Sequence, residues 1–287
     1  MNSKPSKRIH LLPNAITAFG LSCGLFVIFR MSMTPIGGAD LQLLIAISGL
    51  LLLAALADLL DGAIARVMKA ESDFGGFFDS LSDAITFGVA PSVIVLKSLS
   101  LPNGSESSFL LTTAAVVYTV CGVLRLVRYN VTSQAIKGDE ELLLANKKNF
   151  TGLPIPAAAA AAVSGNLFLI SNEFQALFEI SEMTRSLLLF FMLTILGYFM
   201  ISRWKFPSLK SLHIRVASFK LVLITAVTAV LIFYTILHHF PLIFFLISWG
   251  YLFVAFTLSI IRLISGKKSK TLEDFEPEPE DEDEDEE

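Results

Sequence analysis

Four aspartates stand close together in a sequence that is otherwise strongly apolar: Asp58, Asp61, Asp79 and Asp83. Asp58 and Asp61 are three residues apart, and Asp79 and Asp83 are four apart, so each pair shares one face of a helix. An aspartate near the centre of a bilayer costs about 2.5–3.5 kcal/mol, and carboxylates held together also repel one another. Such a cluster therefore needs a counter-ion or a function.

Divalent cations are the counter-ion that fits these ligands. A single arginine within the cluster, Arg66, cannot neutralise four acids, and no His or Cys accompanies them to bind a softer metal. Carboxylate sites favour magnesium, manganese or calcium, and two such ions about 3.5–4 Å apart are a recognised arrangement for phosphoryl chemistry. The alternative is a water-filled vestibule in which the carboxylates are structural.

The elements that position these acids are long apolar runs. Of the 287 residues, 54% are hydrophobic and 24 are phenylalanine, and continuous apolar stretches of about twenty residues are typical of membrane-spanning helices. The sequence predicts an all-α membrane protein, a polytopic bundle of about eight transmembrane helices. We expect them over residues 15–33, 41–63, 79–100, 109–131, 154–171, 184–202, 216–237 and 241–264, with a turn over 68–76 between the two aspartate pairs.

Basic residues are divided unequally between the two ends of these spans. With the N-terminus inside, 19 of the 22 Lys and Arg residues lie on the inner side, and Arg30, Lys97 and Arg185 lie near the outer side. The positive-inside rule then places both termini and all four aspartates on the cytoplasmic side. This basic face suits anionic lipid, and we expect no nucleic-acid partner.

Three segments follow from the composition: a cytoplasmic N-terminal segment over 1–14, a transmembrane catalytic domain over 15–266, and an acidic cytoplasmic tail over 267–287. The stretch from Glu273 to Glu287 carries twelve acidic residues and no basic one. Like charges at this density repel one another, so we expect the tail to be disordered.

The spacing D-x2-D-G-x2-A-R-x8-G-x3-D-x3-D, which runs from Asp58 to Asp83, resembles the signature of the CDP-alcohol phosphatidyltransferases at every position. The stretches LLPNAITAFGLSCGL, RLVRYNV, FTGLPIPAAA and FPSLK are similar to those of its bacterial integral-membrane phosphatidylserine synthases. The resemblance implies a six-helix core over about 15–202 and a place in the bacterial cytoplasmic (inner) membrane. It also implies transfer of a phosphatidyl group from CDP-diacylglycerol to L-serine, giving phosphatidylserine and CMP, by metal-assisted attack of the serine hydroxyl on phosphorus.

The resemblance also implies roles for individual residues. Two ions, Mg²⁺ or Mn²⁺, would be bound by Asp58, Asp61, Asp79 and Asp83, and Asp83 would also be the general base. The residues implied for binding CDP-diacylglycerol are Asn14, Thr17, Gly62, Arg66, Ser72 and Gly75. The acceptor serine brings a carboxylate, which arginine binds bidentately, and the candidates are Arg125, Arg128 and Asn130; both arginines would otherwise be anchors at the membrane surface.

Two other functions stay open at this point. The same phosphatidyl group could pass to glycerol 3-phosphate or inositol. From a different class, the protein could be a metal or ion transporter, because acids within the membrane mark ion pathways. A transporter more often has internal repeats around a midplane site, whereas this sequence shows no repeat and its acids lie at one end. The resemblance leaves a homodimer, the choice of ion and the role of the tail open.

Overall fold

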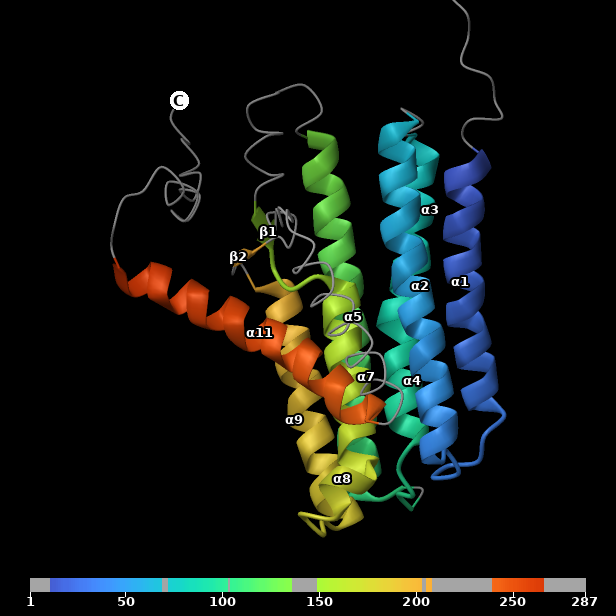
Figure 1. The fold of residues 1–287 in the computed structure, drawn as a ribbon, viewed down its shortest axis with the longest axis vertical. Coiled ribbons are helices and arrows are strands. Elements are labelled where there is room, and N and C mark those ends of the chain that lie inside the picture. The colour runs from blue at the N-terminus through green and yellow to red at the C-terminus, as the bar shows by residue number, and fades with distance from the viewer. Residues whose placement is uncertain are drawn as a thin grey trace, which may run out of the picture.

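The described part of the protein is a bundle of long helices (Figure 1). The computed structural model describes residues 11–68, 72–102, 104–135, 149–202, 205–207 and 239–265. The α-helices are α1 (Leu11–Ser32), α2 (Leu41–Val67), α3 (Asp73–Asp83), α4 (Ala90–Lys97), α5 (Glu106–Ala135), α7 (Ile155–Ile170), α8 (Asn172–Gln175), α9 (Glu182–Ile201) and α11 (Phe240–Ser265). A π-helical turn, η1 (Ala84–Val89), joins α3 to α4 without a break.

Six described segments are long and apolar enough to cross a membrane, so this is a multi-pass membrane protein, and the predicted helical bundle is confirmed. These are Leu11–Ser32, Leu41–Val67, Asp73–Lys97, Glu106–Val131, Glu182–Ile201 and Phe240–Thr257. Helix α7 has 16 residues, fewer than a full span, and lies inside the bundle with most of its alanines buried. The expected span 216–237 and the expected tail 267–287 lie outside the described residues.

Small residues on α7 and large apolar residues on the outer surface explain how the bundle is built. Ala158, Ala161 and Ala162 are fully buried, and small side chains let neighbouring backbones approach closely in a membrane. Outward-facing side chains such as Phe26 and Phe253 are exposed, as lipid-facing residues are. The bundle therefore packs on small residues inside and presents apolar residues outside.

Helix α3 begins earlier than the sequence analysis expected. The turn was expected over 68–76 and the span from Asp79, but the helix starts at Asp73. Ser72 caps it, because its Oγ accepts a hydrogen bond from the Gly75 N–H at 3.1 Å. Asp79 and Asp83 consequently lie within the helix rather than at its start.

The π-helical turn η1 is held from α5 by hydroxyl groups. A π-helix leaves its backbone carbonyls misaligned with an α-helical ladder, and such turns are frequent at functional sites. The Tyr118 hydroxyl donates to the Phe87 carbonyl at 3.0 Å, and Thr119 Oγ1 donates to the Gly88 carbonyl at 3.1 Å. Helix α5 thereby fixes the turn that follows Asp83.

A short antiparallel pair of strands, which the all-α prediction did not include, lies near the C-terminal ends of α5 and α9 (Figure 1). Strand β1 (Asn149–Thr151) pairs with β2 (Lys205–Pro207), with Phe150 opposite Phe206. The strands come from the stretches FTGLPIPAAA and FPSLK noted above. Segments that are distant in the sequence are thus paired at the end of the bundle that carries the aspartates.

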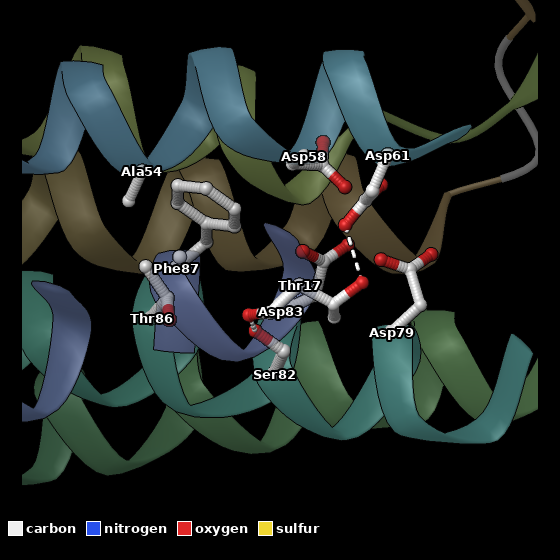
Figure 2. A pocket seen from close by; sticks show the side chains of 10 residues that line it. Thr17, Ala54, Asp58, Asp61, Asp79, Ser82, Asp83, Thr86 and Phe87 are labelled. Atoms are coloured by element: carbon white, nitrogen blue, oxygen red, sulfur yellow. Dashed lines mark hydrogen bonds between the residues drawn. The ribbon is translucent and has the colours of Figure 1, made fainter. Parts of the chain in front are cut away.

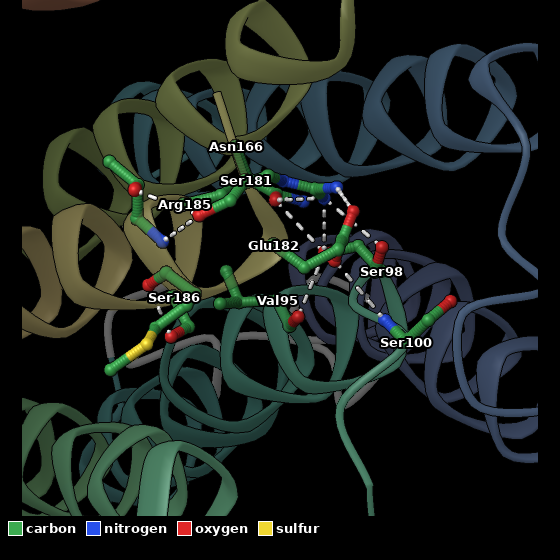
Figure 3. A network of polar contacts seen from close by, with 10 residues as sticks. Val95, Ser98, Ser100, Asn166, Ser181, Glu182, Arg185 and Ser186 are labelled. Atoms are coloured by element: carbon green, nitrogen blue, oxygen red, sulfur yellow. Dashed lines mark hydrogen bonds and ion pairs between the residues drawn. The ribbon is translucent and has the colours of Figure 1, made fainter. Parts of the chain in front are cut away.

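A polar network fastens the opposite end of the bundle (Figure 3). Arg185 of α9 is buried, and its Nη2 donates to the Ser98 carbonyl at 3.0 Å and to Asn166 Oδ1 of α7 at 3.3 Å. Lys97 Nζ donates to the Thr34 carbonyl at 3.2 Å. Two of the three basic residues that were expected near the outer side therefore hold the ends of α1, α4, α7 and α9 together.

Helix α11 runs obliquely across α7 and α9 (Figure 1). Trp249 Nε1 donates to the Ala161 carbonyl at 3.2 Å, and the rings of Phe245 and Phe168 stack with centroids 4.4 Å apart. At its start, His239 Nδ1 lies 2.9 Å from Glu173 Oε1, and this hydrogen bond lowers the pKa of Glu173. These contacts fix α11 against the core of the bundle.

Candidate active site

All four aspartates line one cavity between α1, α2 and the α3–η1 segment (Figure 2). The empty space of the cavity, counted together with its open side, measures about 190 Å³. Its lining consists of Thr17, Gly20, Ala54, Asp58, Asp61, Asp79, Ser82, Asp83, Thr86 and Phe87. The expected convergence of the two aspartate pairs on one volume is confirmed.

Three of the four carboxyl groups form a compact set. One oxygen each from Asp58, Asp61 and Asp79 lie within 4.8 Å of one another. Asp61 is buried, and the other two are partly buried. Asp83 lines the same cavity one helical turn beyond Asp79 but is not part of this set. The structure therefore separates a three-carboxylate group from a fourth carboxylate beside it.

The carboxyl groups have no ion-pair partner among the residues that the structure describes. No Lys, Arg or His nitrogen there lies within 4.0 Å of them; the ion pairs of that part of the chain are Arg185–Glu182 and His239–Glu173. Arg125 of α5 interacts electrostatically with Asp83 over a longer distance. A half-buried set of oxygen ligands without a cation fits a hard divalent ion such as Mg²⁺ or Mn²⁺.

Thr17 orients Asp61 within this set. Its Oγ1 donates to Asp61 Oδ2 at 2.5 Å and also lies 3.1 Å from the Pro13 carbonyl oxygen (Figure 2). Thr17 is itself buried, so α1 supplies a fixed hydrogen-bond donor to the carboxylate of α2. The hydrogen bond fixes the Asp61 carboxylate on the wall of the cavity.

The other residues expected to bind CDP-diacylglycerol form two small groups beside the aspartates. A Cβ added to Gly75 would lie 3.1 Å from Ser72 Oγ and 3.3 Å from Asn14 Oδ1, so these three residues meet between α1 and α3. A Cβ added to Gly62 would lie 3.8 Å from Arg66 Nη1. Gly62 adjoins Asp61 and Gly75 precedes Asp79 by one turn, so both groups flank the acidic set.

The candidates for binding the acceptor differ in what they contact. Arg128 Nη1 donates to the Ile201 carbonyl at 3.1 Å, so its guanidinium is bound to the end of α9. Arg125 Nε is buried and has no hydrogen-bond partner. Asn130 Nδ2 donates to Ser80 Oγ of α3 at 2.9 Å, and Ser80 follows Asp79 in the sequence but does not line the cavity. Arg125 thus interacts with the acidic site through Asp83, Asn130 contacts α3 beside the cavity, and Arg128 is bound to the end of α9.

Several residues of the cavity were not predicted from the sequence, in particular Ser82, Thr86 and Phe87. Thr86 follows Asp83 by three residues and extends the face that carries Gly75 and Asp79. Extending this periodicity by one turn would have identified Thr86 at a step of three residues and Phe87 at a step of four. Ser82 carries no comparable signal.

A family model for CDP-alcohol phosphatidyltransferase matches residues 10–184, which include every residue of the cavity. The match covers more than half of the chain. The chain belongs to the CDP-alcohol phosphatidyltransferase family, so it is an enzyme of phospholipid synthesis embedded in a membrane.

Three curated relatives of this chain have names that specify the reaction product or the acceptor. The CDP-diacylglycerol–serine O-phosphatidyltransferase of Helicobacter pylori is 31% identical over 220 residues, which is 77% of this chain and 81% of the relative. The protein of the same name from Mycobacterium leprae is 34% identical over 169 residues, 57% of this chain and 50% of the relative. The archaetidylserine synthase of Methanothermobacter thermautotrophicus is 35% identical over 158 residues, 52% of this chain and 60% of the relative. All three names include serine.

Proposed function

We propose that the protein transfers the phosphatidyl group of CDP-diacylglycerol to the hydroxyl of L-serine and releases CMP. The observation that carries this proposal is the convergence of four aspartates, at the family's spacing, on one cavity of a membrane-embedded bundle. The choice of serine is supported by relatives whose names specify it. The products are phosphatidylserine and CMP.

Asp58, Asp61, Asp79 and Asp83 hold two divalent ions, Mg²⁺ or Mn²⁺, in this proposal. Their oxygens suit hard cations, and the set has no protein cation to neutralise it among the described residues. When bound, the ions supply positive charge that stabilises the diphosphate and the departing CMP. The hydrogen bond from Thr17 holds Asp61 in place for this task.

The CDP group lies, in this proposal, against the two groups of residues that flank the acids. Gly75 leaves room beside Asn14 and Ser72, and a larger residue would fill that space. The Arg66 side chain is exposed next to Gly62, where its guanidinium can bind a phosphate bidentately. These residues bind and orient the nucleotide rather than take part in bond breaking.

Asp83 is the general base of the proposed reaction. It lies outside the set of three carboxylates, and a carboxylate in reach of the serine hydroxyl can accept its proton as oxygen attacks phosphorus. Arg125 interacts with Asp83 and has an unpaired buried Nε, which suits a bound carboxylate. Binding the serine carboxylate at Arg125 would bring the serine hydroxyl towards Asp83.

The proposed orientation of the protein in the membrane rests on the distribution of its basic residues. The C-terminal ends of α2 and α5 and the start of α3 lie at one end of the bundle, and the network of Arg185 lies at the other (Figure 1). The positive-inside rule then places the aspartates and both termini on the cytoplasmic side of a bacterial inner membrane.

An acceptor panel tests the proposed substrate. Purified protein receives labelled CDP-diacylglycerol with serine, glycerol 3-phosphate, inositol or choline, and the labelled lipid product is identified. We expect a labelled lipid product only when serine is the acceptor. Product with glycerol 3-phosphate or inositol would reassign the acceptor while keeping the enzyme class, and ion flux without CMP release would support the transporter instead.

A further inference from the structure

One polar side chain of the cavity has neither a role in the proposed chemistry nor a hydrogen-bond partner. Thr86 is 1% exposed, lines the cavity together with Asp83, and its Oγ1 has no hydrogen-bond partner. A buried hydroxyl without a partner destabilises a protein, so such a group is retained where it has a use. Figure 2 shows Thr86 beside Phe87 and Ala54, away from Asp61 and Asp79.

The π-helical turn explains why this hydroxyl is free. A threonine within an α-helix commonly donates to the carbonyl four residues before it, as Thr112, Thr113 and Thr194 do here. Thr86 lies in η1, where the backbone follows a wider turn and this local bond is not made. The Tyr118 hydroxyl stabilises the turn at the Phe87 carbonyl, so the fold keeps Thr86 in this position.

Gly24 of α1 has no side chain, and Thr86 occupies the space that a side chain there would fill. A Cβ added to Gly24 would clash with Thr86 Oγ1 itself and would lie 2.9 Å from both Cα and Cβ of Thr86, which is too close for a real contact. Helix α1 therefore approaches the η1 turn closely and covers Thr86 from one side. The Thr86 hydroxyl lies beside Gly24 and is shielded from bulk solvent.

A second cavity begins on the other side of Phe87. The empty space there, counted together with its open side, measures about 260 Å³ and lies between α2, η1, α7 and α11. Its lining is apolar: Leu51, Leu52, Ala55, Phe87, Pro156, Ala159, Ala160, Val163 and Phe244. Since Phe87 lines both cavities, the order from one to the other is carboxylates, a neutral hydroxyl, and then apolar side chains.

We propose that Thr86 binds the lipid donor at its glycerol backbone, with its hydroxyl donating to an ester carbonyl oxygen. This inference rests on the proposed function. A diacylglycerol diphosphate presents the same order of groups as the two cavities: a charged diphosphate, neutral esters and then acyl chains. A neutral hydroxyl matches a neutral ester oxygen, and the apolar cavity behind Phe87 takes the first part of one acyl chain.

The test compares donors with and without ester carbonyls. CDP-diacylglycerol and its diether analogue, CDP-dialkylglycerol, are assayed as substrates of wild-type protein, Thr86→Val, Thr86→Ser and a control, Thr113→Val, whose hydroxyl bonds within α5. We expect the wild type to favour the diester in kcat/KM by about three- to tenfold, the worth of one hydrogen bond. Thr86→Val should lose this preference, while Thr86→Ser and Thr113→Val keep it.

Thermal unfolding gives a second readout that does not depend on turnover. Valine has the shape of threonine without the hydroxyl, so Thr86→Val should melt no lower than wild type in the absence of substrate. The rise in melting temperature on adding CDP-diacylglycerol should be smaller in this variant, whereas the rise on adding CDP should be unchanged.

The outcomes separate this inference from the proposed function. A wild type that releases no CMP from either donor with serine contradicts the proposed function. An active wild type that uses both donors equally, or a Thr86→Val protein that keeps the wild-type preference, contradicts the ester contact alone. The wild-type preference is measured without any variant, so the inference remains testable if Thr86→Val fails to fold.

Discussion

Asp83 differs from the other three aspartates in its surroundings. Asp58, Asp61 and Asp79 bring oxygens within 4.8 Å of one another, whereas Asp83 stands beside them and interacts with Arg125. The motif spacing was sufficient to predict that all four meet, because i+3 and i+4 steps fix the faces of two adjacent helices. The spacing could not predict that three of the four carboxylates form a compact set and that Asp83 stands beside it, because this depends on how α1, α2 and α3 pack.

We expect Asp83→Asn to reduce turnover by at least about 100-fold with little change in the affinity for CDP-diacylglycerol, because asparagine keeps the shape but accepts no proton. Asp58→Asn should lower both the turnover and the affinity for CDP-diacylglycerol. Turnover and lipid binding are measured for each variant, with Asp40→Asn as the control, since asparagine caps α2 as well as aspartate does. Wild-type turnover in Asp83→Asn would remove the base assignment.

The two arginines of α5 should respond differently to replacement by lysine. Arg125→Lys breaks the planar fork and should raise the KM for serine about ten- to a hundredfold. Arg128→Lys should leave the KM for serine nearly unchanged but lower the melting temperature, because Arg128 binds the carbonyls of Ile201 and Ser202 at the end of α9. Steady-state kinetics with serine varied at saturating lipid distinguish them. An unchanged KM in Arg125→Lys would place the serine carboxylate elsewhere.

The segment α3–η1–α4 is the element on which the site depends most. Its first part carries Asp79 and Asp83, and its π-helical turn carries Thr86 and Phe87. The early start of α3 could have been inferred from Ser72 as an N-cap, but the glycines at 75 and 76 favoured a turn. The π-helix could not have been inferred, because hydroxyl groups on α5, distant in sequence, hold it.

Removing the hydroxyl that holds this turn should destabilise the protein. Tyr118 is fully buried, so Tyr118→Phe leaves the Phe87 carbonyl without its partner at a cost of about 1–3 kcal/mol. We expect a lower melting temperature together with weaker binding of CDP-diacylglycerol. Tyr198→Phe, at an exposed position on α9, is the matched control. A Tyr118→Phe protein with the stability and binding of wild type would show that α5 does not hold the turn.

At the scale of the whole molecule, hydropathy and charge predicted a helical membrane bundle with the acids at one end. The described residues agree with this prediction, since six segments qualify as spans and the aspartates share a cavity at the end of α2. The strand pair β1–β2 and the network around Arg185 were not predicted, because both join segments that are distant in sequence. Side-chain patterns within one helix report which face is polar and not which distant partner meets it.

Metal removal tests the whole acidic site at once. We expect activity to be lost in excess EDTA and restored by Mg²⁺ or Mn²⁺, because Asp58, Asp61 and Asp79 have no ion-pair partner among the described residues. Metal content is measured in the same samples. Full turnover in protein shown to be free of metal would overturn the two-ion proposal while leaving the family assignment intact.

Serine-dependent release of CMP tests most directly whether the aspartate cavity transfers a phosphatidyl group to serine. Purified protein is supplied with CDP-diacylglycerol, Mg²⁺ or Mn²⁺ and labelled serine, and CMP and labelled lipid are measured together. We predict equal amounts of CMP and phosphatidylserine from the wild type, and neither from Asp79→Asn. No CMP above a protein-free control, or CMP release without any lipid product from serine, would contradict the account.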